Sequence, residues 1–384
     1  MTSCSSPDAG VRRTIVHVVS PGAVGGIERV VQVLAAEQQA AGGNVHVAAV
    51  VERGDGADAD RFLAPLKSAG VGVHRLEVPP RSYRRERAEL TALCRKLHPA
   101  IVHTHGYRAN LVDGTIARRV GAAAVTTMHG FTGGSVRNRC YEALDRRAAR
   151  RFDAVVAVSA PLARDMTAAG VRADRLHTVR NAWRRTAPPL ERATARTVLG
   201  IAPAPFTIGW AGRVSHEKGL DVLIDALALL AARDVRLAVL GDGPERRSLE
   251  QRAARRGVAA RTTWHGFVPN ADTLFAAFDL FVLSSRTEGT PMVLFEALAS
   301  AVPIVATRVG GVPDVLSGDA GLLVNPDQPQ ALADAIDAVV RDPDGARRRA
   351  NAARDVLNAG ESLGAWVAAY GAAYEAALRI AAAR

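Results

Sequence analysis

The chain has 384 residues, 48% of them hydrophobic but only 5% aromatic, and its formal net charge is +11 at pH 7. This length predicts two domains that each bury a core, and the aliphatic composition favours an α/β fold with buried parallel strands. Three cysteines (Cys4, Cys94 and Cys140) are odd in number and lack metal-ligand spacing, which favours a reducing cytoplasm. The N-terminus has no apolar core like that of a signal peptide, and no apolar run approaches the roughly 18 residues of a membrane span.

The positive charge belongs to one half of the chain. Residues 1–187 carry 28 Lys and Arg against 16 Asp and Glu, or +12, and the remainder carries −1. Arginines cluster at Arg81–Arg87, Arg118–Arg119 and Arg137–Arg151. These clusters predict either solvated helix faces or a surface for an anionic membrane or an anionic acceptor. Nucleic acid is not an expected partner, because no basic motif is interleaved with aromatic residues.

Short apolar strands alternate with amphipathic helices along the chain, which predicts parallel sheets covered on both faces. In the first half the expected strands are Thr14–Val19, Asn44–Val51, Gly72–Leu76, Ile101–Thr104, Ala124–Met128 and Ala154–Val158. A loop-like stretch at Asn181–Pro189 predicts a linker. The expected strands then resume at Phe206–Ala211, Arg236–Leu240, Thr262–His265, Leu280–Ser284, Pro303–Thr307 and Gly321–Val324. The stretch Ser362–Ile380 predicts a closing helix with a broad apolar face.

One polar loop in the second half carries the strongest functional signal. An apolar strand (Asp279–Ser285) leads into Glu288, Gly289 and Pro291, and a helix follows. Pro291 suits the first helical position, and Glu296 then lies about five residues into the helix. The free amides at the helix start are a ready anion site. A ligand with hydroxyls and phosphates could contact both glutamates and these amides together; two unrelated surface glutamates are the alternative.

A second loop offers positive charge. Arg213 and Lys218 follow the predicted strand Phe206–Ala211, in a loop that begins with Gly212. A guanidinium and an ammonium five residues apart can together neutralise a diphosphate. Cations near a helix start oppose the helix dipole, so an anion is expected to accompany them.

These segments resemble the retaining glycosyltransferases of family 4, which have the GT-B fold and use nucleotide-sugar donors. The resemblance rests on Gly209–Leu227, Leu240–Glu245, Asp279–Leu316, His265–Asn270 and Gly321–Pro326, and more loosely on Pro21–Val31, His103–Gly106, Thr127–Gly130 and Val158–Ser159. It implies two facing Rossmann-like domains with a cleft between them. Residues 1–187 would form the acceptor side together with the closing helix (residues 362–384), which crosses back to it. Residues 188–361 would bind the nucleotide-sugar.

The resemblance also implies roles for individual residues. Arg213 and Lys218 would neutralise the leaving diphosphate. Glu288 would bind hydroxyls of the donor sugar, Glu296 those of the ribose, and His129 would line the reaction centre. Further donor contacts, mostly through backbone, are expected at Gly25, Gly26, Gly212, Gly241, Phe267, Val268, Gly289, Thr290, Pro291, Met292, Val293 and Leu294. For Gly241 a purely structural turn is nearly as good an interpretation.

No metal or cofactor is predicted. His103 and His105 share one face of a strand, but no third ligand is evident, so lining of the cleft or packing is the better interpretation. Two Asp-x-Asp sequences (Asp58 to Asp60 and Asp342 to Asp344) lie in polar loops or near helix starts and are interpreted as incidental. The nucleotide-sugar would be a co-substrate.

The sequence therefore predicts a cytoplasmic, metal-independent, retaining hexosyltransferase. A UDP-sugar is favoured as donor, with a GDP-sugar as the alternative, and the acceptor would present a hydroxyl from a glycan, a lipid-linked intermediate or a small molecule. Peripheral contact with the inner face of a membrane would bring in a lipid-linked acceptor. Two other functions stay open: a nucleotide-sugar epimerase of the same fold, and a non-catalytic partner that binds nucleotide-sugars.

Overall fold

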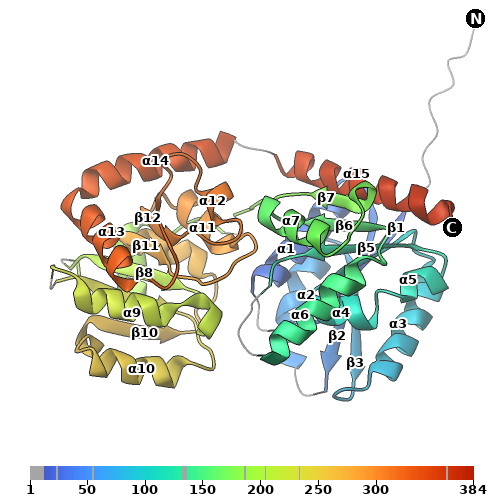
Figure 1. Cartoon of the computed structure of the whole chain (residues 1–384), viewed down its shortest axis with the longest axis horizontal. Helices are drawn as coiled ribbons and strands as arrows, with labels where there is room; N and C mark the ends of the chain where they lie inside the picture. Colours follow the sequence, from blue (N-terminus) through green and yellow to red (C-terminus); the bar gives the residue numbers. More distant parts are fainter. Residues whose placement is uncertain are drawn as a thin grey trace, which may run out of the picture.

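The computed structural model describes residues 13–22, 25–53, 56–131, 136–185, 187–203, 205–232, 234–359 and 362–384. Two parallel β-sheets, each flanked by helices, form two lobes that lie side by side (Figure 1). We call the lobe built on strands β1–β7 the N-terminal lobe and the lobe built on β8–β13 the C-terminal lobe. The predicted α/β class with two Rossmann-like halves is confirmed.

The N-terminal sheet has the strand order β3-β2-β1-β4-β5-β6-β7, with every neighbouring pair parallel. Its elements are β1 (Thr14–Val19), α1 (Gly26–Ala40), β2 (Asn44–Glu52), α2 (Gly56–Ser68), β3 (Gly72–Val78), α3 (Tyr83–Leu97), β4 (Ile101–His105), α4 (Tyr107–Val112), α5 (Ile116–Arg119), β5 (Ala123–Met128), α6 (Val136–Ala149), β6 (Ala154–Ala157), α7 (Ala160–Ala168), η1 (Ala173–Arg175) and β7 (Leu176–Thr178).

The C-terminal sheet repeats this plan with the order β10-β9-β8-β11-β12-β13, again all parallel. Its elements are α8 (Arg192–Val198), β8 (Thr207–Ala211), η2 (His216–Lys218), α9 (Leu220–Leu229), β9 (Arg236–Leu240), α10 (Arg246–Arg255), η3 (Ala259–Arg261), β10 (Thr262–Gly266), η4 (Ala271–Ala277), β11 (Leu280–Leu283), α11 (Met292–Ala299), β12 (Ile304–Thr307), α12 (Val312–Val315), β13 (Leu322–Val324), α13 (Pro329–Arg341) and α14 (Pro343–Ala359). The last helix of the chain, α15 (Leu363–Ala382), follows.

In both sheets the strand order reverses beside the first strand, between β1 and β4 and between β8 and β11. Open α/β sheets bind ligands at such a reversal, outside the carboxyl ends of the strands, because the loops there diverge to opposite faces. The loops that follow β8 and β11 carry Lys218 and Glu288. The topology therefore directs these predicted site residues to the same edge of the C-terminal sheet.

Helix α15 returns to the N-terminal lobe, as predicted. Its side chains Trp366, Tyr370 and Tyr374 are buried among aliphatic residues of α1, β5 and β6. Figure 1 shows α14 over the C-terminal lobe and α15 over the N-terminal lobe. Within the described residues, no helix is both long and apolar enough to span a bilayer.

The predicted strands are confirmed to within a few residues at their ends, with two corrections. Strand β7 was not predicted, because its three residues (Leu176–Thr178) are partly exposed at the sheet edge and form no apolar run. Pro291 was expected to be the first helical residue, but it precedes the helix with φ −72° and ψ 116°. Its carbonyl accepts a hydrogen bond from the amide of Leu294 (3.2 Å), so the turn starts from Pro291 while α11 begins at Met292.

Candidate functional site

The loop between β11 and α11 brings a glutamate and a lysine together. Oε1 of Glu288 accepts hydrogen bonds from Nζ of Lys218 (2.7 Å) and from the Ser285 hydroxyl (2.7 Å). The Glu288 side chain is only 8% exposed and that of Lys218 26%, so the pair is largely withdrawn from water. Partial desolvation strengthens such a pair and makes the loss of either partner costly. The sequence predicted both residues but not their direct contact.

The start of α11 keeps its amide donors available. No described backbone carbonyl or side chain accepts from the amides of Gly289, Thr290, Met292 or Val293. Amide donors at this helix start are therefore available beside the Lys218–Glu288 pair, and the anion site stays a prediction.

Arg213 lies in the same region without a partner. It is exposed two residues after β8, and none of the described residues pairs with its guanidinium. Gly212 before it has φ +158°, where the chain turns away from the sheet. A second cation thus lies in the loop of Lys218, free to bind an anion from outside the chain.

The N-terminal lobe touches this loop directly. Gly289 packs so closely on the carbonyl of His129 that a Cβ at position 289 would lie 1.8 Å from that oxygen. Hydroxyls of Thr287 and Thr290 donate to the carbonyls of Phe131 and Val158, each at 2.7 Å. His129, predicted to line the reaction centre, therefore lies against the Glu288–Gly289 loop of the other lobe.

Two further glycines allow this approach. A Cβ on Gly310 would lie 1.8 Å from the carbonyl oxygen of Glu288, and one on Gly311 would lie 2.5 Å from that of Gly289. Gly310 also has φ +50°, which favours glycine. The amide of Gly311 donates to the carbonyl of Gly289 (2.7 Å). These glycines fix the loop from behind; the sequence analysis did not single them out, although they form a Gly-Gly pair in the motif it used.

Glu296 lies on α11 with an unusual charge environment. Burial and, to a smaller extent, the charge of Asp272 raise the pKa of its carboxyl to about 7, while Arg29 opposes the shift. Arg29 of α1 pairs with Asp272 of η4 across the lobes (3.4 Å). The Glu296 carboxylate has no hydrogen-bond donor among the described residues.

The pocket beside Glu288 has a volume of about 340 Å³ and is lined by both lobes. Its walls are Gly130, Phe131, Glu142, Arg146, Ser159, Pro161, Leu162, Asp165, Thr287, Glu288 and Gly310. The Arg146 guanidinium lies 3.8 Å from the centre of the Phe131 ring. The pocket can hold a group of sugar size, with Glu288 at one wall and charged residues of α6 and α7 at the other.

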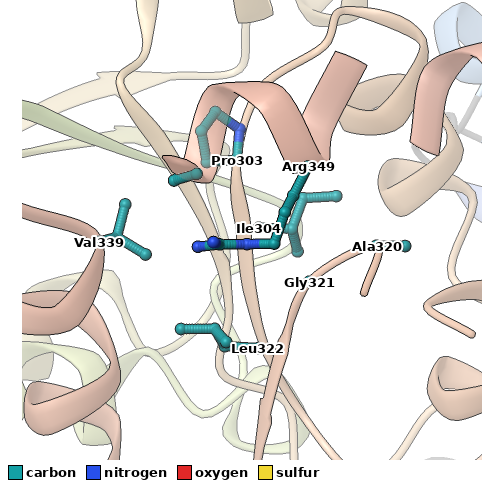
Figure 2. Close-up of a pocket in the computed structure, with 8 residues that line it drawn as sticks. Pro303, Ile304, Ala320, Gly321, Leu322, Val339 and Arg349 are labelled. Atoms are coloured by element: carbon teal, nitrogen blue, oxygen red, sulfur yellow. The ribbon is translucent and has the colours of Figure 1, made fainter. Parts of the chain in front are cut away.

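A second crevice, shown in Figure 2, has a volume of only about 10 Å³. It lies at the amino end of β12, where Pro303, Leu322 and Val339 surround the Arg349 side chain. Space of this size holds at most about one water molecule. It also lies at the opposite end of the strand from the carboxyl edge, so we assign it no ligand.

The remaining predicted donor-contact residues belong to both lobes. Gly25 and Gly26 begin α1, and Gly26 faces Met292 of α11, with a would-be Cβ 4.0 Å from its Cγ. Phe267 is exposed after β10 and lies under the Arg61 guanidinium of the other lobe (5.5 Å), while Val268 is partly buried. The structure gives Gly241 a structural reason, because a Cβ there would lie 1.8 Å from the carbonyl oxygen of Gly212.

The histidine pair has a third member that the sequence analysis missed. His17 of β1 lies beside His103 and His105 of β4, and one ring nitrogen from each lies within 4.8 Å of the others. The statement that no third ligand is evident was therefore wrong. The signal was present, since neighbouring parallel strands align His17 with His103, but the strand order is needed to find it.

The Asp-x-Asp sequences have structural partners within the chain. Asp58 pairs with Arg61, and Asp60 with Arg75 (3.2 Å). Asp342 accepts from the amide of Gly345 at the start of α14 (2.9 Å). Of the three cysteines, Cys94 and Cys140 are unpaired thiols, and Cys4 lies outside the described residues.

Arg286 was not predicted and holds the two functional loops together. Its guanidinium makes two hydrogen bonds to Asp221 (2.8 Å each) and one to Asp327 (2.7 Å). It also donates to the carbonyl of His216 in η2 (2.7 Å). Arg286 thereby ties the Glu288 loop to the Lys218 turn, and only the tertiary fold shows this connection.

Two family models match the chain. One, described as glycosyl transferases group 1, matches residues 205–342, and one, described as glycosyl transferase 4-like domain, matches residues 25–182. The two models together assign most of the chain to the glycosyl transferases. Together the two matches include the Lys218 and Glu288 loops as well as His129.

Curated relatives support this membership over parts of their length. The lipopolysaccharide core biosynthesis mannosyltransferase LpsB of Rhizobium meliloti (strain 1021) is 34% identical over 50% of this chain and 57% of its own. The alpha-D-kanosaminyltransferase of Streptomyces kanamyceticus is 33% identical over 45% and 46%. A D-inositol 3-phosphate glycosyltransferase of Xylanimonas cellulosilytica is 34% identical over 65% of both chains. The chain matches roughly half the length of most of these relatives.

Solved structures match the fold of this glycosyl transferase over nearly its whole length. Anabaena Alr3699/HepE, in complex with UDP and glucose, matches with a TM-score of 0.81 at 22% identity, covering 94% of this chain and 98% of that protein. Sucrose-phosphate synthase from Thermosynechococcus elongatus matches with a TM-score of 0.80 at 20% identity, covering 95% and 98%. WaaG, a glycosyltransferase involved in lipopolysaccharide biosynthesis, matches with a TM-score of 0.72 at 17% identity, covering 94% and 98%. The GT-B fold predicted from the sequence is thereby confirmed.

Proposed function

We propose that the chain is a metal-independent, retaining glycosyltransferase that moves a sugar from a nucleotide diphosphate-sugar to a hydroxyl acceptor. One observation carries the proposal. The Lys218–Glu288 pair and the open amides of α11 meet His129 of the other lobe at the carboxyl edges of both sheets. Such a site offers positive charge and amide donors for phosphates, and carboxylates for hydroxyls, next to a pocket of sugar size.

The donor would lie along α11. Its diphosphate would lie over the helix start, within reach of Arg213 and Lys218, and its ribose would donate hydroxyl hydrogens to Glu296. Glu288 would then exchange part of its contact with Lys218 for hydroxyls of the sugar. A UDP-sugar is favoured because the Anabaena protein of the same fold was solved with UDP and with UDP-glucose. A GDP-sugar is the alternative.

The acceptor would enter the 340 Å³ pocket from the side of α6 and α7. Arg146, Glu142 and Asp165 at that wall can bind a polar molecule, and Glu288 at the opposite wall marks the position of the donor sugar. By their names, one relative acts in lipopolysaccharide core biosynthesis and another on D-inositol 3-phosphate. A glycan, a lipid-linked intermediate or a small molecule therefore fits, with action in the cytoplasm, where the free thiols of Cys94 and Cys140 would persist.

The proposed reaction proceeds on one face of the sugar. The bond from the anomeric carbon to the diphosphate oxygen breaks, and the leaving phosphate accepts the proton of the incoming hydroxyl as the new glycosidic bond forms. Arg213, Lys218 and the amides of α11 would stabilise the negative charge that grows on the diphosphate. The protein contributes position and charge, so no separate general base is required.

A donor panel tests this function directly. The chain would be incubated with UDP- and GDP-sugars, with and without hydroxyl acceptors, and the products followed by mass spectrometry. Transfer that depends on an acceptor supports the proposal; conversion of the donor to its epimer without acceptor would identify an epimerase, and binding without turnover a non-catalytic partner. Glu288→Ala should abolish transfer, whereas Glu250→Ala, at a partly exposed glutamate on α10, should not. NMR of the product should show the anomeric configuration of the donor.

A further inference from the structure

A chain of buried polar groups runs from His129 into the core of the N-terminal lobe. Nε2 of His129 contacts Nδ1 of His105 (3.1 Å), and Nε2 of His105 contacts Nδ1 of His17 (3.0 Å). Nε2 of His17 contacts Oε1 of Gln38 on α1 (2.8 Å). The chain continues as Nε2 of Gln38 donates to the hydroxyl of Tyr374 on α15 (3.0 Å). We call these five groups and their continuation through His103 the histidine relay.

The relay continues beyond Tyr374 in the same direction. The Tyr374 hydroxyl contacts Nδ1 of His103 (2.8 Å), and Nε2 of His103 contacts the Thr127 hydroxyl (2.8 Å). Each imidazole therefore uses Nε2 toward the next group and Nδ1 toward the previous one. The exception is His129 at the head of the relay, because no described residue bonds to its Nδ1.

Gln38 gives the relay its polarity. An amide has one accepting and one donating end, whereas a neutral imidazole or a hydroxyl can be turned either way. With Oε1 of Gln38 facing His17, Nε2 of His17 must carry the hydrogen, so its Nδ1 accepts. The same reasoning then puts the hydrogen on Nε2 of His105 and on Nε2 of His129. Nδ1 of His129 is left as a bare lone pair at the lobe interface.

The imidazoles of the relay are neutral at physiological pH. Burial lowers the pKa of His17 and of His129 to about 4, and it holds the pKa values of His103 and His105 well below the usual range. Positive charge on a neighbouring histidine would lower the pKa values of His103 and His105 further. Among the described residues, no carboxylate raises them. Each ring therefore stays uncharged and carries one hydrogen, and the question is which of its two nitrogens holds that hydrogen.

The same three histidines satisfy the distance requirement of a metal site, but their chemistry favours the relay. Both ring nitrogens of His17, His103 and His105 already have hydrogen-bond partners at 2.8 to 3.1 Å. A divalent cation would have to displace these partners and would be buried without an acidic ligand. The complete set of hydrogen bonds therefore argues for positioning.

We propose that the histidine relay locks the tautomer of His129, so that its Nδ1 is held as a hydrogen-bond acceptor for a hydroxyl of the donor sugar, with Gln38, His17 and His105 as positioning residues. This inference rests on the proposed function for the sugar contact, but not for the tautomer itself. It gives α15 a part in the site, since Tyr374 accepts a hydrogen bond from Gln38. A sugar hydroxyl would donate to Nδ1, and no proton would be transferred.

Ring-nitrogen NMR of the full chain labelled with [¹⁵N]histidine tests the lock, because the chemical shifts distinguish a protonated from a bare nitrogen. In the wild type at pH 7, His17, His103, His105 and His129 should all carry hydrogen on Nε2. Gln38→Glu keeps an acceptor for His17 and should preserve hydrogen on Nε2 of His17, His105 and His129. Gln38→Leu removes the acceptor and should give mixed tautomers at His17, His105 and His129. His46→Gln is a matched control, because it breaks the separate His46–His74 contact (3.0 Å).

Several outcomes would overturn the lock. They are hydrogen on Nδ1 of His129 in the wild type, an imidazolium at pH 7, or an unchanged His129 tautomer in Gln38→Leu. Coordinated shifts of His17, His103 and His105 on addition of zinc would favour a metal site instead. If Gln38→Leu does not fold, the wild-type tautomers alone still decide the question.

Calorimetric binding of UDP and UDP-glucose connects the lock to function. Loss of one neutral hydrogen bond weakens binding about 2- to 10-fold. Gln38→Leu should weaken UDP-glucose binding by this factor and leave UDP binding unchanged, whereas equal loss for both ligands would contradict a sugar contact. A wild type that binds neither ligand would count against the proposed donor while the NMR result on the tautomer stands.

Discussion

The two faces of the interdomain site are built by opposite means. The C-terminal face carries charged groups and open donors: Lys218 and Glu288 form a largely buried pair, Arg213 is exposed, and helix amides are open. The N-terminal face at His129 rests on neutral imidazoles that are fully buried behind it. A growing phosphate charge needs strong, fixed counter-charges, whereas a sugar hydroxyl needs a directed acceptor. Under the proposed function, the C-terminal lobe would stabilise the leaving group, and His129 of the N-terminal lobe would orient the sugar together with Glu288.

Removing a charge from the C-terminal face should have the largest effect. Lys218→Ala deletes the cation expected at the leaving diphosphate and leaves Glu288 without its partner, so kcat should fall by about 100-fold or more. Arg213→Ala should lower kcat less, because its exposed guanidinium is screened by water. Steady-state rates with UDP-glucose and an acceptor measure both, with Lys67→Ala on the exposed side of α2 as control.

Excess EDTA should leave the wild-type rate unchanged. If EDTA abolishes the rate and only magnesium or manganese restores it, the proposal that Arg213 and Lys218 neutralise the diphosphate without a metal is wrong.

Separating the two faces should be nearly as damaging. Gly289→Ala would place a methyl group 1.8 Å from the carbonyl oxygen of His129, so the lobes could not approach as they do here. Misplacement by about 1 Å can cost about 100-fold in rate. Gly371→Ala on α15, where a Cβ meets nothing within 4 Å, is the matched control. Rates and small-angle scattering would be compared, and full activity in Gly289→Ala would show that this contact is not part of the working state.

The two faces also differ in how much of them the sequence reveals. Lys218, Glu288 and the start of α11 lie in contiguous motifs, because one loop and one helix turn supply them, and the parallel strands follow from apolar runs. The histidine relay joins β1, α1, β4, β5 and α15, so no local pattern contains it. His17 and Gln38 are 21 residues apart in sequence, and Gln38 and Tyr374 are 336 apart. Only the strand order and the return of α15 bring them together.

Glu296 provides a test with a pH signature. Glu296→Gln or Glu296→Ala should weaken UDP binding about 10- to 150-fold, the effect of losing a charge-assisted hydrogen bond. The pKa of the Glu296 carboxyl in the folded wild type is about 7, so its carboxylate forms between pH 6 and pH 8. UDP affinity should therefore rise over that range. Glu296→Gln should show a flatter profile. Unchanged UDP affinity in both variants would rule out the ribose assignment.

The same shift predicts an effect on stability. The folded carboxyl of Glu296 keeps its proton up to about pH 7, whereas in the unfolded chain it loses the proton near the usual glutamate pKa of 4.5. The folded state therefore binds more protons between these values, and the contribution of Glu296 to stability falls as pH rises through this window. Glu296→Gln should gain stability relative to the wild type at pH 8 but not at pH 4, as measured by denaturant unfolding.

The smallest expected effect concerns the basic surface of the N-terminal lobe. Arg84 and Arg85 of α3 are exposed, as are Arg147 and Arg150 of α6, and the described parts of these helices flank α4 and α5. Each arginine near an anionic membrane contributes about 1 kcal/mol, screened within a Debye length. Sedimentation with anionic vesicles should then exceed that with neutral vesicles at low salt and decline at physiological salt. Equal sedimentation with both would favour an acceptor that is not in a membrane.

The return of α15 has a mechanical consequence. The polypeptide passes between the lobes twice, once between β7 and α8 and again between α14 and α15 (Figure 1). Two bodies joined by one tether can rotate about any axis, but two tethers restrict them to swinging about the line through both connections. If the lobes separate, they would rotate about this single axis. Gly289 would then move away from His129 and return to the same place at each closure. Cutting the second connection would leave both lobes folded, but they would no longer return to the same relative orientation at each closure.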